Sequence, residues 1–191
     1  MAFSTELLWA LIGLILTIGG TFLEAFVTTP SLGAAGYQTH SLGVTYQFGA
    51  ALLVGCLGGK NAAALSQIAY IMLGLTWFPV FAQGGGLGYL KEPSFGYILG
   101  FIPGAWLCGY LAFKASAKLE SLAFSCLCGL SSIHVTGMLY LAAMYGLGAN
   151  QSGLPLQQSL MKYSLYPLPG QLAIVCAVTV LAFTLRQLMF Y

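Results

Sequence analysis

The sequence predicts an all-α integral membrane protein, in which a single domain forms a bundle of six transmembrane helices. Hydrophobic residues make up 59% of the 191 residues and charged residues only 5%, whereas about a quarter of a soluble domain is charged. The mean hydropathy is +0.87. A spanning helix needs about 20 apolar residues, so this length holds about six spans and no soluble domain besides.

Six apolar stretches define the expected helices. They lie near residues 5–27, 43–58, 61–82, 95–114, 120–147 and 169–190. The second and third stretches are nearly continuous, so we expect a tight turn around residues 58–61, which read GGKN. The alternating strands of a membrane β-barrel are not found. The first stretch is too long for a signal peptide and follows no basic segment, so we expect it to be retained.

Positive charges orient the bundle. With six spans both termini lie on one face, and that face carries Lys60, Lys114, Lys118 and Arg186, against Lys91 and Lys162 on the other. Because cytoplasmic loops carry the excess of Lys and Arg, the termini are expected to be cytoplasmic. The outer face then holds the three long connections, at residues 28–43, 79–94 and 148–170.

Polar residues at membrane depth are costly unless they are paired or face a cavity. The sequence places six there: Glu24, Gln47, Gln67, His134, Tyr140 and Gln171. An interhelical hydrogen bond is the commoner explanation of any one of them. Gln47, Tyr97 and Gln171, however, all fall in the outer half, beside the glycine-rich connection. This convergence predicts a ligand pocket that opens to the outside.

The glycine-rich run GGGLG at residues 84–88 is not a nucleotide-binding fingerprint. Lys91 stands where the last glycine of G-x-G-x-x-G is required, and no strand–helix–strand pattern surrounds it. The sequence has no Walker motif either, so ATP hydrolysis by this chain is excluded. We expect no nucleic-acid partner.

Two further patterns suggest chemistry only weakly. Ser131 and Ser132 precede His134, but they share one helix with it and the sequence has no aspartate to orient the imidazole, so an intramembrane hydrolase stays a remote alternative. The five cysteines all fall within spans: Cys56, Cys108, Cys126, Cys128 and Cys176. Because Cys126 and Cys128 point to different sides of a helix, we interpret the cysteines as small packing residues. No metal site and no cofactor is expected.

Residues 57–101 are similar to the BioY family, the membrane-embedded biotin-binding S component of energy-coupling factor (ECF) transporters. Three motifs carry the resemblance: LGGK at 57–60, GLTWFPVF at 74–81 and EPSFGYILGF at 92–101. The resemblance implies an S-component-like fold in the plasma membrane of a prokaryote and a binding protein rather than an enzyme. It further implies transport of biotin or a related small vitamin, and partnership with a coupling membrane subunit and two ATPase subunits. A solitary carrier without ATPases remains the alternative.

The resemblance also implies a substrate site. Family members carry an aspartate and a lysine, expected partners of the ureido group of biotin, where this chain has Gln171 and Ile174. An amide both donates and accepts hydrogen bonds, so Gln171 suits a neutral ureido group. Glycines would let the loop backbone approach the ligand, and Lys91 would meet a carboxylate. The expected substrate-binding residues are Gln47, Phe81, Gly84, Gly85, Lys91, Gly96, Tyr97, His134, Tyr140 and Gln171.

Overall fold

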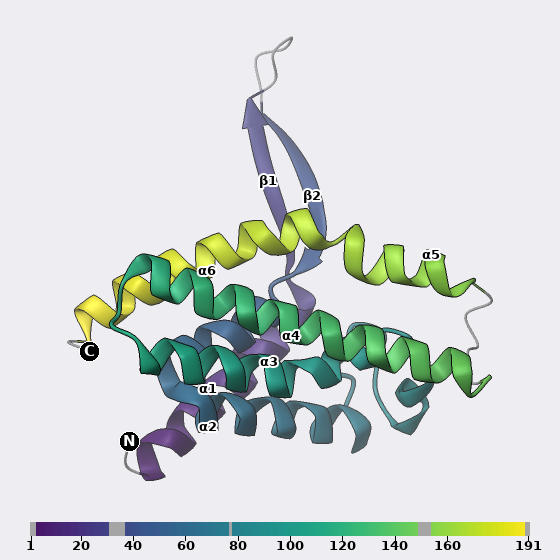
Figure 1. Ribbon diagram of the computed structural model, residues 1–191, viewed down its shortest axis with the longest axis horizontal. Helices are drawn as coiled ribbons and strands as arrows, with labels where there is room; N and C mark the ends of the chain where they lie inside the picture. Colours follow the sequence, from purple (N-terminus) through teal and green to yellow (C-terminus); the bar gives the residue numbers. More distant parts are fainter. Residues whose placement is uncertain (1–2, 31–36, 77, 149–153, 190–191) are drawn as a thin grey trace.

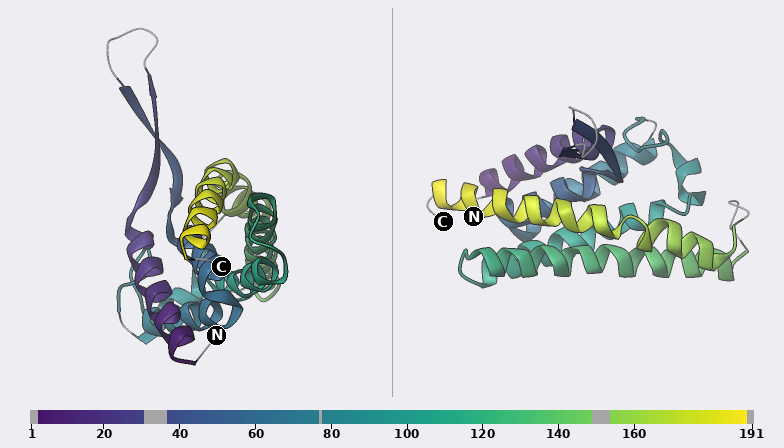
Figure 2. Two further views of the ribbon diagram at one scale, coloured as in Figure 1. Left: turned by 90° about the vertical axis from the view of Figure 1, so that its left-hand side faces the viewer. Right: turned by 90° about the horizontal axis from the view of Figure 1, so that it is seen from above.

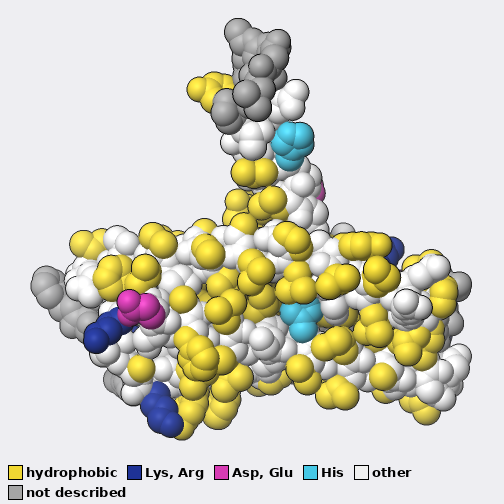
Figure 3. Space-filling view, turned by 45° about the horizontal axis from the view of Figure 1, so that its top comes forward, with side chains coloured by type: hydrophobic (Ala, Val, Ile, Leu, Met, Phe, Trp, Pro, Cys, Tyr) yellow, Lys and Arg dark blue, Asp and Glu magenta, His cyan; other side chains and the backbone are white. Residues whose placement is uncertain are grey.

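The computed structural model describes residues 3–30, 37–76, 78–148 and 154–189 and is mostly helical. The helices are α1 (Phe3–Phe22), α2 (Gln47–Thr76), α3 (Phe95–Lys114), α4 (Leu119–Gly146), α5 (Leu156–Leu160) and α6 (Leu168–Leu188). The long helices pack side by side, and both ends of the described chain lie at the same end of the bundle (Figure 1). Hydrophobic side chains cover the face seen in Figure 3, as expected for a surface in contact with lipid.

The expected count of six spans is not confirmed, because five helices of the described ranges are long and apolar enough to cross a membrane. The stretches expected at 43–58 and 61–82 form one element, α2. This element has a non-helical residue at its centre, Gly59, with φ 80° and ψ 175°. Its two helical parts are about 18 and 26 Å long. A full span needs a helix of about 20 residues, or about 30 Å, so each part is shorter than a full span.

Gly59 reverses the direction of the chain. In a straight helix Gln47 and Tyr70 would lie about 34 Å apart, yet the Gln47 amide nitrogen is 2.8 Å from the Tyr70 hydroxyl oxygen. A positive φ of this size favours glycine over any residue with a side chain. The expected turn at residues 58–61 is therefore present, as a single-residue break rather than a loop.

Close contact between helices depends on glycines. A Cβ atom on Gly109 of α3 would lie 2.6 Å from the backbone nitrogen of Lys60, and one on Gly55 would lie 2.9 Å from the carbonyl oxygen of Ala105. Gly104 similarly faces the backbone of Gly129 on α4. Small residues at such positions let helix backbones approach directly, which is the main source of helix association in lipid.

A β-hairpin was not expected and corrects the all-α prediction. Strands β1 (Glu24–Pro30) and β2 (Tyr37–Thr45) pair antiparallel, with Val27 opposite His40. The hairpin projects from the bundle between α1 and α2 (Figure 2). The first helix accordingly ends at Phe22 rather than near residue 27, because Val and Thr residues there favour strands over helices. The tip of this connection, residues 31–36, lies outside the described ranges.

The remaining helices follow the expected boundaries closely, except before α6. Helix α3 matches the expected range 95–114, and α4 begins and ends one residue before its expected range of 120–147. The connection expected at 148–170 instead contains α5 and a π-helical turn, η2 (Met161–Leu165), and with α6 they make one apolar segment. A short 3₁₀ helix, η1 (Leu87–Lys91), lies within the glycine-rich connection. Residues 149–153 of the later connection are not among those described.

The contact at Gly109 predicts a measurable stability loss. Gly109→Ala would place a methyl group against the rigid backbone at Lys60, so we expect destabilisation by about 1–3 kcal/mol, which lowers the unfolding midpoint by about 2–10 °C. The measurement is thermal unfolding in detergent. Gly19→Ala is the matched control, because a Cβ atom at Gly19 meets nothing within 4 Å. Equal midpoints for the two variants would contradict this account of the packing.

Candidate functional site

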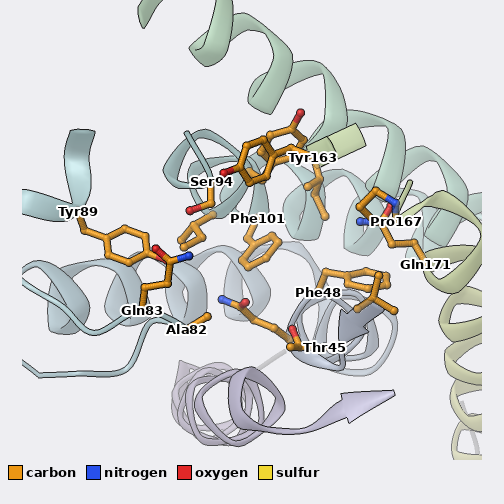
Figure 4. A pocket seen from close by; sticks show the side chains of 15 residues that line it. Thr45, Phe48, Ala82, Gln83, Tyr89, Ser94, Phe101, Tyr163, Pro167 and Gln171 are labelled. Atoms are coloured by element: carbon orange, nitrogen blue, oxygen red, sulfur yellow. The ribbon is translucent and has the colours of Figure 1, made fainter. Parts of the chain in front are cut away.

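A cavity of about 240 Å³ lies where the start of α2, the glycine-rich connection, α3, α4 and the start of α6 meet. Its volume is below the roughly 300–1,000 Å³ of common ligand pockets, so it suits a small ligand. Figure 4 shows side chains from all these segments turned toward a common space. The lining residues are Val44, Thr45, Gln47, Phe48, Ala82, Gln83, Tyr89, Ser94, Tyr97, Ile98, Phe101, Ile133, Tyr163, Pro167 and Gln171.

Gln47 offers this cavity a hydrogen-bond acceptor. Its amide nitrogen donates to the Tyr70 hydroxyl at 2.8 Å. The single hydroxyl proton of Tyr70 is directed to the carbonyl oxygen of Val80 at 2.9 Å, so Tyr70 can only accept from Gln47. This fixes the orientation of the amide and leaves the Gln47 carbonyl oxygen for a ligand.

Gln171 offers a donor. Its Oε1 atom lies 2.7 Å from Nε2 of the buried His134. When the His134 Nε2–H donates to this oxygen, the NH₂ group of Gln171 remains for the cavity. His134 Nδ1 is buried and has no hydrogen-bond partner in the described part of the chain, and the ring lies edge-on to Tyr97, with centroids 5.8 Å apart. His134 is therefore a positioning residue for the Gln171 amide.

Aromatic side chains form the rest of the wall. Tyr97 and Tyr163 lie with ring centroids 6.1 Å apart, and the Tyr97 hydroxyl is 2.6 Å from Ser164 Oγ. Phe48 and Phe101 are buried on other sides of the cavity. At the end formed by the glycine-rich connection, burial raises the pKa of Tyr89 above its usual value, so this phenol stays neutral and can donate a hydrogen bond. The site thus combines an apolar body with a few neutral polar groups.

The glycine-rich connection supports the cavity from behind. Gly84 and Gly86 have φ of 110° and 93°, and the Gly86 N–H donates to the carbonyl oxygen of Gly74 at 2.7 Å. A Cβ atom on Gly85 would lie 2.3 Å from the carbonyl oxygen of Phe78. Gly84 and Gly85 therefore fit the loop onto the end of α2 and are not among the cavity lining, whereas the adjacent Ala82 and Gln83 are.

Five other expected residues also lie outside the lining, and one of them is His134, which reaches the cavity only through Gln171. The Phe81 ring is buried on Gly74 and contacts Tyr89 at a centroid distance of 4.6 Å. Gly96 lets α3 approach Tyr140, whose hydroxyl donates to the carbonyl oxygen of Leu90. Lys91 is exposed at the end of η1. Phe81, Gly96 and Tyr140 thus anchor the glycine-rich connection, and Ile174 packs against Gly49 instead of facing this cavity.

Several lining residues escaped sequence reasoning. Phe48, Phe101 and Ile133 belong to apolar helical stretches, in which nothing distinguishes a residue facing a cavity from one facing lipid. Tyr163 lies on the π-helical turn η2, and such turns are frequent at functional sites. The nearby Pro167 and a tyrosine-rich run at residues 163–166 were the available signals.

The geometry gives the hydrolase alternative no support. His134 Nε2 faces Gln171 rather than a serine. Ser131 Oγ donates to the carbonyl oxygen of Leu127 at 2.9 Å, one helical turn back. An activated serine requires a hydrogen bond to its base, and the described residues of this helix do not provide one.

Tyr70 is predicted to stabilise the fold around Gln47 and to hold the Gln47 amide in place. Its hydroxyl joins Gln47, the Val80 carbonyl and Thr21 Oγ1, which is 3.1 Å away. Tyr70→Phe leaves these buried groups without their partner, so we expect a loss of about 1–3 kcal/mol in unfolding free energy, measured by thermal or denaturant unfolding in detergent. Tyr110→Phe is the control, since no hydrogen bond of its hydroxyl is found within the described ranges. A Tyr70→Phe variant as stable as that control would refute the role.

Known proteins resemble this chain over different lengths. A protein of Cyanophora paradoxa, described as an uncharacterized 21.2 kDa protein in the psbX-ycf33 intergenic region, is 27% identical over 184 residues, which are 96% of this chain and 95% of that protein. The probable biotin transporter BioY of Lysinibacillus sphaericus is 45% identical over 67 residues. That match spans 35% of this chain and about a third, 34%, of the transporter's length.

A solved structure shares the fold. It is described as the S-component for biotin from an ECF-type ABC transporter, and it aligns with a TM-score of 0.65 at 20% sequence identity. The alignment covers 96% of this chain and 89% of the other. In addition, the family model described as BioY family matches residues 4–190, nearly the whole sequence. The chain therefore belongs to the BioY family.

Proposed function

We propose that this protein is the membrane-embedded substrate-binding subunit of a biotin uptake system. The observation that carries the proposal is the pair of amides in the cavity: Gln47 is held with its oxygen free and Gln171 with its nitrogen free. Together they offer one acceptor from α2 and one donor from α6 to an otherwise mostly apolar space. The names of relatives, which include biotin transporters, support the same substrate.

Biotin matches this arrangement group by group. Its cyclic urea is neutral and carries one carbonyl oxygen and two N–H groups, so the Gln171 NH₂ group would donate to the oxygen and Gln47 would accept from an N–H. Each neutral hydrogen bond contributes about 0.5–1.5 kcal/mol. The fused rings and aliphatic chain would pack on Phe48, Phe101 and Tyr97. A ligand of about 16 heavy atoms can reach nanomolar affinity within the known ligand-efficiency range.

The carboxylate of biotin would lie toward the glycine-rich connection. Gln83, Tyr89 and Ser94 bring neutral donors to that end of the cavity, and Lys91 remains the predicted cation for the carboxylate once the loop closes over a ligand. Neutral donors in a partly buried site bind a carboxylate without burying a second charge. Capture from outside would require the cavity to open beside this connection.

The transport step would use partner subunits. We infer that the protein lies in the plasma membrane of a prokaryote, with cytoplasmic termini, and works with a coupling membrane subunit and two ATPases. The sequence contains no ATP-binding motif of its own, and the S-component fold of the solved structure supports this arrangement. In this system Gln171 would bind the substrate and His134 would position the Gln171 amide.

Biotin titration of the purified protein in detergent tests the proposal first. The wild-type protein should bind with a sub-micromolar Kd, and Gln171→Ala should weaken binding about 10-fold, because one neutral hydrogen bond and its desolvated partner are lost. His134→Ala should weaken it less, since it only frees the Gln171 amide to rotate. Gln187→Ala, at the opposite end of α6, is the matched control and should bind as wild type. Absence of biotin binding by the wild-type protein would overturn the substrate assignment.

Dependence on the partner subunits has its own test. Biotin uptake is measured in a biotin-auxotrophic host that lacks the energy-coupling module, with this protein expressed alone and then together with the module. We expect accumulation against a gradient only in the second case, because this chain has no means of hydrolysing ATP. Equal accumulation in both hosts would instead favour the solitary carrier.

A further inference from the structure

Three cysteine thiols meet at one point inside the bundle, along the helices from the ligand cavity. Cys56 of α2, Cys108 of α3 and Cys126 of α4 are all buried and all free. The distances between their sulfur atoms are 3.6 Å for Cys56–Cys108, 3.5 Å for Cys56–Cys126 and 4.0 Å for Cys108–Cys126. Sequence spacing gives no hint of this cluster, because each thiol comes from a different helix.

The triangle of sulfurs has the size of a metal site. The point equidistant from the three atoms lies about 2.1 Å from each, as follows from the three sides. Bonds between thiolates and metal ions such as zinc are about 2.3 Å long. An ion slightly out of the sulfur plane would therefore contact all three without movement of any helix.

Glycines bring these thiols together. A Cβ atom on Gly129 of α4 would lie 2.9 Å from Cβ of Cys108, and one on Gly55 of α2 would lie 3.3 Å from the same atom. The three helices therefore approach each other closely beside the thiols. Packing alone needs only small side chains here, which alanine provides, whereas three sulfurs at this separation also make a ligand set.

We propose that Cys56, Cys108 and Cys126 form a three-sulfur site for a soft monovalent cation, copper(I). Soft thiolate ligands favour copper(I), zinc and iron–sulfur clusters, and zinc normally requires a fourth ligand. Within the described residues no histidine or carboxylate joins the cluster. The side chain that contacts Cys126 from α6 is the hydroxyl of Thr179, a hard ligand. Three-coordinate copper(I) matches this donor set.

The charge of the complex and the surroundings of the cluster are also compatible with copper(I). Binding forms three Cu–S bonds, breaks three S–H bonds and releases three protons to water, and copper stays copper(I), so the complex carries two negative charges. The buried Arg186 of α6, whose guanidinium donates to the carbonyl oxygen of Ala112 one turn beyond Cys108, would offset part of that charge. A hollow of about 340 Å³ has Gly58, Gly59 and Gly109 in its lining, and Gly109 directly follows Cys108 in α3. By helix rise, the cluster is about 10 Å from the nearest cavity-lining residues of α3 and α4, Phe101 and Ile133.

The test uses a Cys128→Ala/Cys176→Ala background, in which only the three clustered thiols remain. Anaerobic titration with copper(I) held by a chromophoric chelator should show uptake of one equivalent, and X-ray absorption should show three sulfurs at about 2.3 Å. Adding Cys56→Ala, Cys108→Ala or Cys126→Ala should each reduce copper(I) affinity at least about 100-fold, more than the loss of an outer-shell partner. Each variant is first shown to be folded by its unfolding midpoint and by biotin binding.

Each outcome decides the proposal. Stoichiometric copper(I) binding that depends on all three thiols supports it, together with a raised unfolding midpoint and unchanged biotin affinity. Uptake that survives loss of a clustered thiol, or binding with fewer than three sulfurs, refutes it and identifies adventitious copper. Preferential binding of zinc with a nitrogen or oxygen ligand in the shell would also refute the copper(I) assignment.

Discussion

Helices in lipid associate through close contact rather than through a hydrophobic force, because the surrounding acyl chains are as apolar as the side chains. In this protein that constraint is met where glycine lets one backbone rest on another. Gly109 faces the backbone of Lys60, and Gly104 faces that of Gly129. The chain reversal at Gly59 lies next to the first of these contacts, because Gly59 directly precedes Lys60. These contacts set the positions of α2, α3 and α4, on which both the cavity and the thiol cluster depend.

The biotin cavity follows from this frame because each polar group in it is oriented by a neighbour. Tyr70 directs the Gln47 amide, and His134 directs the Gln171 amide. An amide free to rotate would present donor and acceptor equally and discriminate little between ligands, whereas a fixed amide presents one of the two. The glycine-rich connection contributes through rigidity: Gly74, Gly85 and the buried Phe81 hold it against the end of α2. Its cavity-lining residues are Ala82, Gln83, Tyr89 and Ser94.

The two halves of the bundle then differ in chemistry. The half near the hairpin and the glycine-rich connection has a mostly apolar cavity with a few neutral polar groups. The other half brings soft sulfur atoms together beside the break in α2. Because the same three helices run through both halves, occupancy of the thiol cluster would restrain helix movement without touching the cavity. The β-hairpin projects from the bundle between α1 and α2, and the last residues of β2, Val44 and Thr45, belong to the cavity lining.

The sequence by itself determined the membrane environment, most helix boundaries, the turn near Gly59 and the convergence of Gln47, Tyr97 and Gln171, because hydropathy and charge act along the chain. It missed the hairpin, since seven to nine polar and β-branched residues beside a membrane span also fit a loop. It named Phe81, Gly84 and Tyr140 as substrate-binding residues, and in the structure these three lie outside the cavity lining. Which face of an apolar helix lines a cavity, and whether Cys56, Cys108 and Cys126 meet, was decided only by the tertiary structure. Both depend on helix rotation and on contacts between residues more than 15 positions apart, which no local pattern specifies.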